Sequence, residues 1–146
     1  MKKSFWLRYF ITIGIIGLIL IVSMRPGPYH DGIYEGKSGA GYIHEPYTGM
    51  VKIEIKNSHF TKIDFSIMDT LNNEIFDSTY WKHYIGNKIY IAQCRQDWKG
   101  VLYYPRRLIE TQDIEKVDAI SGATWSYNLF KQSTLMALKA ANDSKH

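Results

Sequence analysis

The residues of this sequence that most strongly suggest a chemical role are the seven from Asp118 to Thr124, which read Asp-Ala-Ile-Ser-Gly-Ala-Thr. The pattern acid, two spacers, Ser, Gly, Ala, Thr would occur by chance in about one of several thousand chains of this length and average composition. Its last residue, Thr124, offers an aliphatic hydroxyl, which is a weak nucleophile until a base and a metal activate it. The segment therefore suits a hydroxyl that another enzyme modifies, and nothing around it resembles a catalytic site of its own.

The other candidate residues of this segment have supporting roles. Gly122 and Ala123 are small and would let the segment enter the cleft of a modifying enzyme, while Asp118 and Ser121 would fix the turn or be read by that enzyme. The ordinary alternative is a simple helix N-cap, with the hydroxyl of Ser121 or Thr124 as the capping group. No Glu or Gln stands three residues after either hydroxyl, so a capping box cannot form.

An amphipathic helix is predicted directly after this segment, from Trp125 to Ala141. No Gly or Pro interrupts it. Its expected buried face consists of Leu129, Ser133, Met136 and Ala140, broadened by Phe130 and Ala137. The start of such a helix has free amides and the positive end of the helix dipole, so an anion beside Thr124 would be favoured.

Two alternating segments further upstream predict an antiparallel β-hairpin. The expected inward residues are Val51, Ile53 and Ile55 in the first segment and Ile63, Phe65 and Ile67 in the second. A turn is predicted at 57–59, and a turn with a short strand at 31–36. The glycine-rich residues 37–41 are predicted to form a hairpin loop, because they lack the spacing of a phosphate-binding loop and are not followed by a helical pattern.

The region between the hairpin and the motif is less regular. Residues 74–84 fit a helix or a strand, and residues 88–94 fit a strand or a buried helix. Residues 96–100 are predicted to form a turn, and Pro105 to open a helix at its first position. Together these elements predict an α+β fold in which an antiparallel sheet packs with helices.

The N-terminal residues predict a membrane anchor. An apolar run extends from Tyr9 to Met24, which as a helix spans about 24 Å, and residues 5–8 would extend it to the roughly 30 Å of a bilayer core. Three positive charges precede this run and one follows it, which predicts a domain on the extracytoplasmic side. Cleavage as a signal peptide is the alternative, although a small-x-small site is missing. We therefore expect a single-pass anchor and linker at residues 1–28 and a domain at residues 29–146.

The charge distribution argues against nucleic acid as a partner. The chain holds 18 Lys and Arg and 14 Asp and Glu. Four of the basic residues flank the apolar run, and every acidic residue lies beyond Pro28, so the expected domain has no net charge. Such a domain lacks the excess of positive charge that binding to a phosphate backbone requires.

The cysteine and histidine content restricts the redox cofactors. Cys94 is the single cysteine, which excludes an intrachain disulfide, a cysteine-ligated iron–sulfur cluster and a covalently attached haem. The five histidines have no metal-ligand spacing, so no metal site is expected. Any redox chemistry would then depend on an organic cofactor.

The order of strands, helix, Asp-x-x-Ser-Gly-Ala-Thr and amphipathic helix resembles the FMN-binding domain family, which includes the C subunit of the sodium-pumping NADH:quinone reductase and the G subunit of the Rnf complex. The resemblance begins at Asp31 and is most specific over Val117 to Thr124. In that family a separate flavin transferase uses FAD and Mg²⁺ to join FMN to the last Thr of the motif through a phosphoester bond, with release of AMP. The resemblance implies covalent FMN on Thr124, and it implies a cofactor-binding segment completed by Asp118, Ser121, Gly122 and Ala123.

The function that this resemblance implies is a membrane-anchored electron carrier in the cell membrane. Its implied partners are the flavin transferase, membrane redox proteins and the lipid bilayer. Two alternatives stay open: a flavin-dependent reductase with its own substrate, and a non-redox anchored binding module. Tyr80, Trp81 and Tyr84 would either stack on the flavin or belong to the core, and Trp125 would either cover the flavin or pack beneath the helix.

Overall fold

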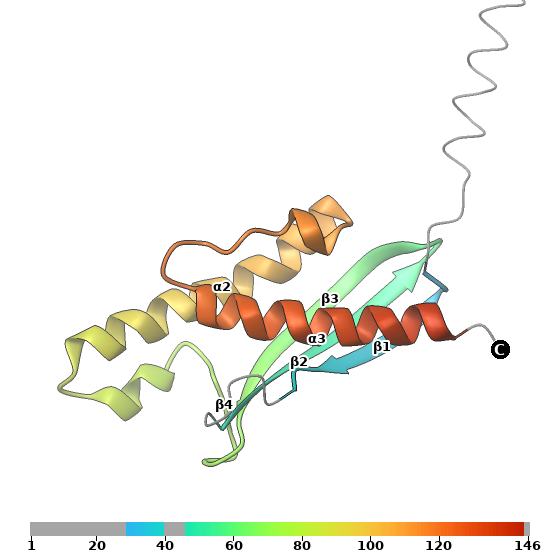
Figure 1. Ribbon diagram of the computed structural model, residues 1–146. Helices are drawn as coiled ribbons and strands as arrows, with labels where there is room; N and C mark the ends of the chain where they lie inside the picture. Colours follow the sequence, from blue (N-terminus) through green and yellow to red (C-terminus); the bar gives the residue numbers. More distant parts are fainter. Residues whose placement is uncertain (1–28, 40–45, 145–146) are drawn as a thin grey trace, which may run out of the picture.

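The computed structural model describes residues 29–39 and 46–144 (Figure 1). The predicted anchor and linker at residues 1–28 and the last two residues of the predicted loop, 40 and 41, lie outside these ranges. Within these ranges, no helix combines the length and the apolar character that a bilayer span requires.

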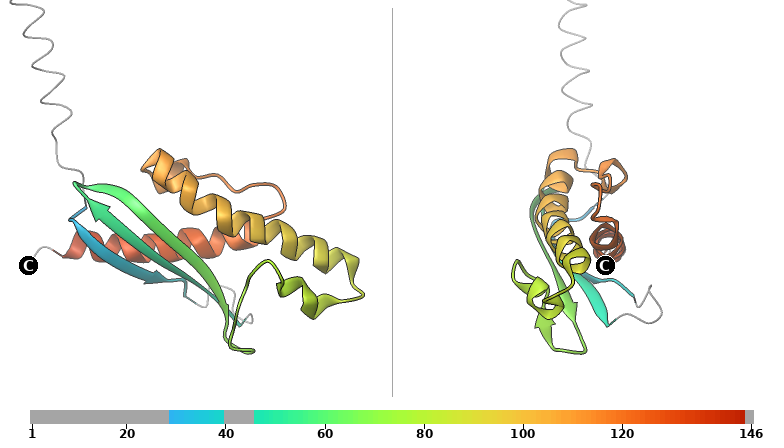
Figure 2. Two further views of the ribbon diagram at one scale, coloured as in Figure 1. Left: turned by 180° about the vertical axis from the view of Figure 1, so that it is seen from behind. Right: turned by 90° about the vertical axis from the view of Figure 1, so that its left-hand side faces the viewer.

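A four-stranded antiparallel sheet forms one layer of the domain. Its strands follow chain order and are β1 (Gly32–Lys37), β2 (Tyr47–Lys56), β3 (His59–Asp69) and β4 (Glu74–Ile75). Two helices form the second layer, with α3 (Thr124–Asp143) over β1 and β2 and α2 (Lys88–Thr111) over β3 (Figures 1 and 2). This arrangement confirms the predicted α+β fold of an antiparallel sheet packed with helices.

The predicted hairpin is formed by β2 and β3. The apolar residues that alternate along β2 are all buried, namely Val51, Ile53 and Ile55. The connecting turn consists of Asn57 and Ser58, whose φ angles are +51° and +59°, as in the two-residue turns whose twist matches the twist of paired strands. His59, which the sequence placed in the turn, instead begins β3 opposite Lys56.

The main departure from the predicted elements is α2, which is one continuous helix of 24 residues. The predicted turn at 96–100 and the predicted helix start at Pro105 are both wrong. Pro105 lies inside α2 and is buried, although proline in a helix interior costs about 3 kcal/mol. The helix continues because Val101, Tyr104 and Leu108 form one buried stripe against the rest of the core, and this packing outweighs the local preference.

Helix α3 begins one residue before its predicted start. Four residues of its expected buried face are indeed buried, namely Leu129, Phe130, Ser133 and Ala137. Met136 and Ala140 are exposed instead, and Thr134, Leu138 and Ala141 are buried. Because α3 contacts both the sheet and α2, two neighbours set its buried face, and counting apolar residues along the helix does not locate them.

The segment from 74 to 84, for which helix and strand both fitted, contains β4 and the 3-10 helix η1 (Tyr80–Tyr84). In Figure 2 this segment lies beside the first turns of α2, at the end of the sheet where β2 begins. A second 3-10 helix, η2 (Ile114–Lys116), follows α2 and leads into the Asp118 to Thr124 segment.

Candidate functional site

The Asp118 to Thr124 segment forms the connection between η2 and α3, and most of its side chains face solvent. Thr124 is the first residue of α3, and its side chain is exposed. Asp118, Ser121 and Gly122 are also exposed, whereas Ala123 is fully buried. The Thr124 hydroxyl is therefore accessible to an external enzyme.

A tight turn precedes Thr124. The amide of Ala123 donates to the carbonyl of Ile120 at 3.1 Å, and Gly122 has a φ of +78°, a value that favours glycine. Among the described residues, no hydrogen bond involves the side chain of Asp118 or Ser121, so of the two predicted roles their side chains do not fix the turn by hydrogen bonds, and recognition by the modifying enzyme stays a prediction.

Tyr104 of α2 stabilises the turn from the core side, and its side chain is fully buried. Its hydroxyl donates to the carbonyl of Ala123 at 2.8 Å and accepts from the amide of Ile120 at 3.3 Å. The Ser126 hydroxyl oxygen also lies 3.0 Å from the carbonyl of Ala123, and it shares its single hydrogen between this carbonyl and the Asp97 carboxylate of α2. The backbone of the segment is thus anchored, while the Thr124 side chain remains outside.

A buried carboxylate of α2 replaces the expected capping hydroxyl. The N-cap position of α3 is Ala123, and no side chain caps it locally. Asp97, only 3% exposed, accepts from the amide of Ser126 at 3.2 Å and from its hydroxyl at 3.0 Å. The interpretation of Ser121 or Thr124 as the N-cap is therefore wrong. Sequence reasoning missed Asp97, because it lies in a different helix.

Gln93 connects this carboxylate to the motif. Its side-chain amide donates to Asp97 Oδ2 at 2.7 Å and to the carbonyl of Gly122 at 2.8 Å. Burial raises the pKa of Asp97, and hydrogen bonds from Gln93 and Ser126 oppose this rise. Asp97 and Gln93 together link α2, the Gly122 turn and the first turn of α3.

A cavity of about 270 Å³, which we call the aromatic cavity, adjoins this network. Its lining residues are Tyr47, Phe76, Tyr80, Tyr84, Tyr90, Gln93, Cys94, Asp97 and Trp125. Trp125 directly follows Thr124, and its ring lies edge-on to the rings of Tyr47 at 5.1 Å and Phe76 at 5.4 Å. No residue from Asp118 to Thr124 lines the cavity, and Trp125, the next residue in the chain, connects Thr124 to it.

The sequence identified some of these aromatic residues and missed others. Tyr80, Tyr84 and Trp125, each considered as a flavin contact, line the aromatic cavity. Trp81 does not line it and instead lies beneath the guanidinium of Arg95, with 5.4 Å between that group and the ring centroid. The sequence missed Tyr47, Phe76 and Tyr90 because they come from separate elements that only the fold brings together.

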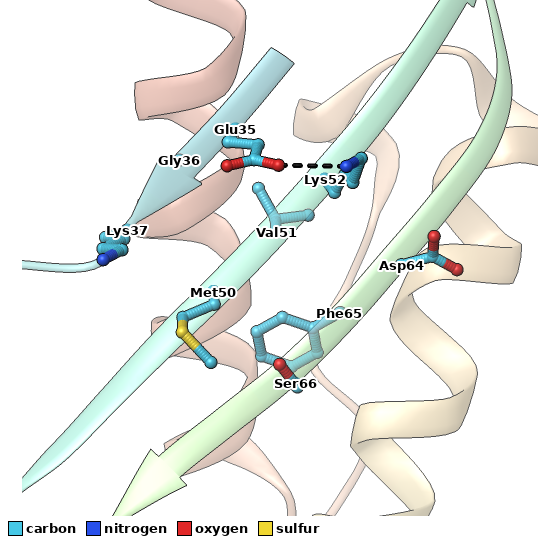
Figure 3. A pocket seen from close by; sticks show the side chains of 9 residues that line it. All are labelled: Glu35, Gly36, Lys37, Met50, Val51, Lys52, Asp64, Phe65 and Ser66. Atoms are coloured by element: carbon cyan, nitrogen blue, oxygen red, sulfur yellow. Dashed lines mark ion pairs between the residues drawn. The ribbon is translucent and has the colours of Figure 1, made fainter. Parts of the chain in front are cut away.

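A second cavity of about 280 Å³ lies over β1, β2 and β3 (Figure 3). Figure 3 shows Glu35 and Lys52 bridging two strands across it, with 3.1 Å between the carboxylate and the ammonium group. None of its lining residues belongs to the motif, to α2 or to α3. Among the described residues, no group of three or more His, Cys, Asp or Glu could hold a metal ion. We therefore take the aromatic cavity as the candidate site.

Comparison with known proteins gives two structural likenesses. No family model matches the chain, and no curated protein matches it. The crystal structure of the CPE2226 protein from Clostridium perfringens is similar to it with a TM-score of 0.58 and 24% identity, over 80% of this chain and 92% of that chain. A solution NMR structure of a protein from Clostridium thermocellum covers 80% of this chain and 95% of its own, with a TM-score of 0.45 and 19% identity. The first likeness supports the fold alone, and neither name states an activity or a ligand.

Proposed function

We propose that this protein carries FMN on Thr124 through a phosphoester bond and acts as an electron carrier anchored to the extracytoplasmic side of the membrane. The observation that carries the proposal is that Thr124 is exposed and that Trp125, the next residue in the chain, lines a cavity with aromatic walls. A separate flavin transferase would supply the base and the Mg²⁺ that a weakly nucleophilic hydroxyl requires, and would release AMP from FAD.

The residues of the aromatic cavity fit a flavin. Flat aromatic side chains suit a flat heteroaromatic ring, and six of the nine lining residues are Tyr, Phe or Trp. Thr124 stands at the start of a 20-residue helix, where the helix dipole favours a phosphate. The bound cofactor would supply the electron chemistry, and the protein would supply attachment, orientation and electrostatics.

The arrangement of the domain suits an anchored carrier. Tyr29, where the described chain begins, packs against Phe60 beside the β2–β3 turn, whereas Tyr47 of the aromatic cavity lies at the other end of β2. Ten strand residues span roughly 30 Å. An anchor at residues 1–28 would thus leave the cavity far from the attachment point and open to redox partners. A covalent bond would retain the cofactor outside the cell by keeping its local concentration high.

The test is the intact mass of the full chain after co-expression with a flavin transferase. We expect a gain of one FMN less one water in the wild type and no gain in Thr124→Val. The exposed Thr124 side chain has no hydrogen bond among the described residues, so this variant should remain folded. Denatured Thr124→Val that still shows flavin fluorescence, or a wild type without added mass, would refute the proposal.

A further inference from the structure

A chain of hydrogen bonds begins at a buried carboxylate and ends at the wall of the aromatic cavity. Asp69, which is 1% exposed, accepts from the amides of Leu71 at 2.9 Å and Asn72 at 3.1 Å. It also accepts from the side-chain amide of Asn72 at 2.7 Å and from the hydroxyl of Tyr80 at 2.5 Å. Burial alone would raise the pKa of Asp69, but these hydrogen bonds outweigh burial and lower it. The carboxylate is therefore ionised at neutral pH and acts only as an acceptor.

This carboxylate determines the direction of the tyrosine hydrogen bonds. A phenol has one hydrogen to donate, and Tyr80 donates it to Asp69. In the hydrogen bond of 3.1 Å between Tyr47 and Tyr80, Tyr47 must then be the donor and Tyr80 the acceptor. The Tyr47 hydroxyl has no second hydrogen. In the hydrogen bond of 3.4 Å between Tyr47 and Tyr84, Tyr84 must therefore be the donor and Tyr47 the acceptor.

The pKa shifts of the tyrosines agree with this direction. Burial, followed by the hydrogen bond to Asp69, raises the pKa of Tyr80 to about 12. Burial and the hydrogen bond to Tyr80 raise the pKa of Tyr47, and the hydrogen bond to Tyr47 is the largest cause of the raised pKa of Tyr84. All three hydroxyls therefore stay protonated at neutral pH, and none can give its hydrogen to a ligand without breaking the chain.

On the side formed by Tyr84, Gln93 and Asp97, the wall of the cavity consequently presents acceptors. Among the described residues nothing donates to the Tyr84 oxygen, which keeps its lone pairs. Gln93 already donates both hydrogens of its side-chain amide, to Asp97 and to Gly122, so only its side-chain oxygen can bind a ligand, as an acceptor. The Asp97 carboxylate is also an acceptor. A ligand that matches this side of the wall must bring a hydrogen-bond donor on an otherwise aromatic body.

We propose that Tyr84, oriented by Asp69 through Tyr80 and Tyr47, accepts a hydrogen bond from N3–H of the flavin ring. N3–H is the only N–H group of an oxidised isoalloxazine, in which N1, N5 and the two carbonyl oxygens are acceptors. The chain of hydrogen bonds thereby selects the edge of the flavin ring that enters the cavity. It also disfavours flat heteroaromatic ligands that have no hydrogen-bond donor. This inference rests on the proposed function, since it assigns the recognition of the same cofactor.

The test compares lumiflavin with 3-methyllumiflavin, which lacks the N3 hydrogen, by fluorescence titration of the full chain produced without the transferase. One hydrogen bond between neutral groups corresponds to about a two- to twelvefold difference in affinity. We expect wild type to bind lumiflavin more tightly by this factor, and Tyr84→Phe to bind both ligands equally. Tyr80→Phe removes the link between Asp69 and the other hydrogen-bonded tyrosines, so it should reduce the preference for lumiflavin over 3-methyllumiflavin. Tyr90→Phe is the matched control. The ring of Tyr90 stacks on Tyr84 with centroids 5.2 Å apart and lines the same cavity, but the Tyr90 hydroxyl takes no part in the chain of hydrogen bonds.

Equal affinities in the wild type, no binding of either ligand, or an equal loss of preference in Tyr90→Phe and Tyr84→Phe would each overturn the inference. Circular dichroism establishes that the variants are folded, and the wild-type comparison does not depend on any variant. Failure here can be told from failure of the proposed function, because the mass gain on Thr124 is measured separately. A wild type that gains FMN mass but shows no preference for lumiflavin overturns only the assignment of Tyr84.

Discussion

At the scale of residues, the Asp97 carboxylate holds the first turn of α3 from a neighbouring helix. It accepts hydrogen bonds from the amide and hydroxyl of Ser126 and from Gln93. Burial raises its pKa above the ordinary 3.8, although these hydrogen bonds oppose the rise. A carboxyl group with a raised pKa binds its proton more tightly in the folded state than in the unfolded state. Its contribution to stability therefore falls as the pH rises from 3.8 through the folded-state pKa.

We predict that Asp97→Asn destabilises the protein and changes how its stability depends on pH. Asn keeps an oxygen for Ser126 but loses the second acceptor, used by Gln93, so the free energy of unfolding should drop by about 1–3 kcal/mol at acidic pH. This deficit should shrink as the pH rises above 3.8, because the wild-type carboxylate becomes a buried charge. Urea denaturation of both proteins across a pH series measures the difference.

The matched control for this prediction is Asp118→Asn, which changes an exposed carboxylate without a hydrogen bond among the described residues. It should leave the free energy of unfolding unchanged at each pH. If the deficit of Asp97→Asn grew with rising pH, the ionised carboxylate would be a net stabiliser of the start of α3, contrary to the pKa shift.

At the scale of elements, the close crossing of α2 and α3 beneath the motif depends on Gly100. A Cβ atom there would lie 2.6 Å from Ser126 Oγ, 2.7 Å from a ring carbon of Tyr104 and 3.0 Å from the Cβ of Ala123. All three atoms belong to residues that anchor the turn before Thr124. Gly100, which in the sequence contributed to the predicted turn at 96–100, is thus the position where α2 and α3 approach each other beneath the motif.

We predict that Gly100→Ala lowers the free energy of unfolding by about 1–3 kcal/mol, as overpacking of a core does. In a helix without such contacts the same change would stabilise by about 1 kcal/mol, so the sign of the effect tests the crossing. The control is Gly39→Ala, where no heavy atom of the described residues, apart from the neighbours of Gly39 in the chain, lies within 4 Å of the added carbon. Chemical denaturation of both variants gives the comparison, and a stabilised Gly100→Ala would contradict the crossing.

At the scale of the whole molecule, the proposed function requires that the domain be held at a membrane by residues 1–28, which lie outside the described ranges. We predict that the full chain stays in the membrane fraction after alkaline carbonate extraction, because the apolar run from Tyr9 to Met24 is long enough to serve as an anchor. A chain that begins at residue 29 should be released. Release of the full chain, or an N-terminal sequence that starts between Met24 and His30, would contradict the anchor.

Patterns between residues close in the chain were enough to predict the β2–β3 hairpin, α3 and the motif. Alternation of apolar residues predicted the β2–β3 hairpin, and the absence of Gly and Pro predicted α3, because both signals act between residues close in the chain. The motif from Asp118 to Thr124 was identified by residue types alone, and its exposure agrees with an accessible Thr124 hydroxyl.

Packing between whole elements sets the course of α2 and assembles the network and the cavity next to the motif. Pro105 and Gly100 are local signals for a break, and they are overridden because packing against the sheet and α3 stabilises one continuous helix. The Asp97 contact to Ser126 joins residues 29 positions apart. The aromatic cavity likewise gathers side chains from β2, η1, α2 and α3. Such contacts depend on how whole elements pack, and no spacing along the sequence specifies them.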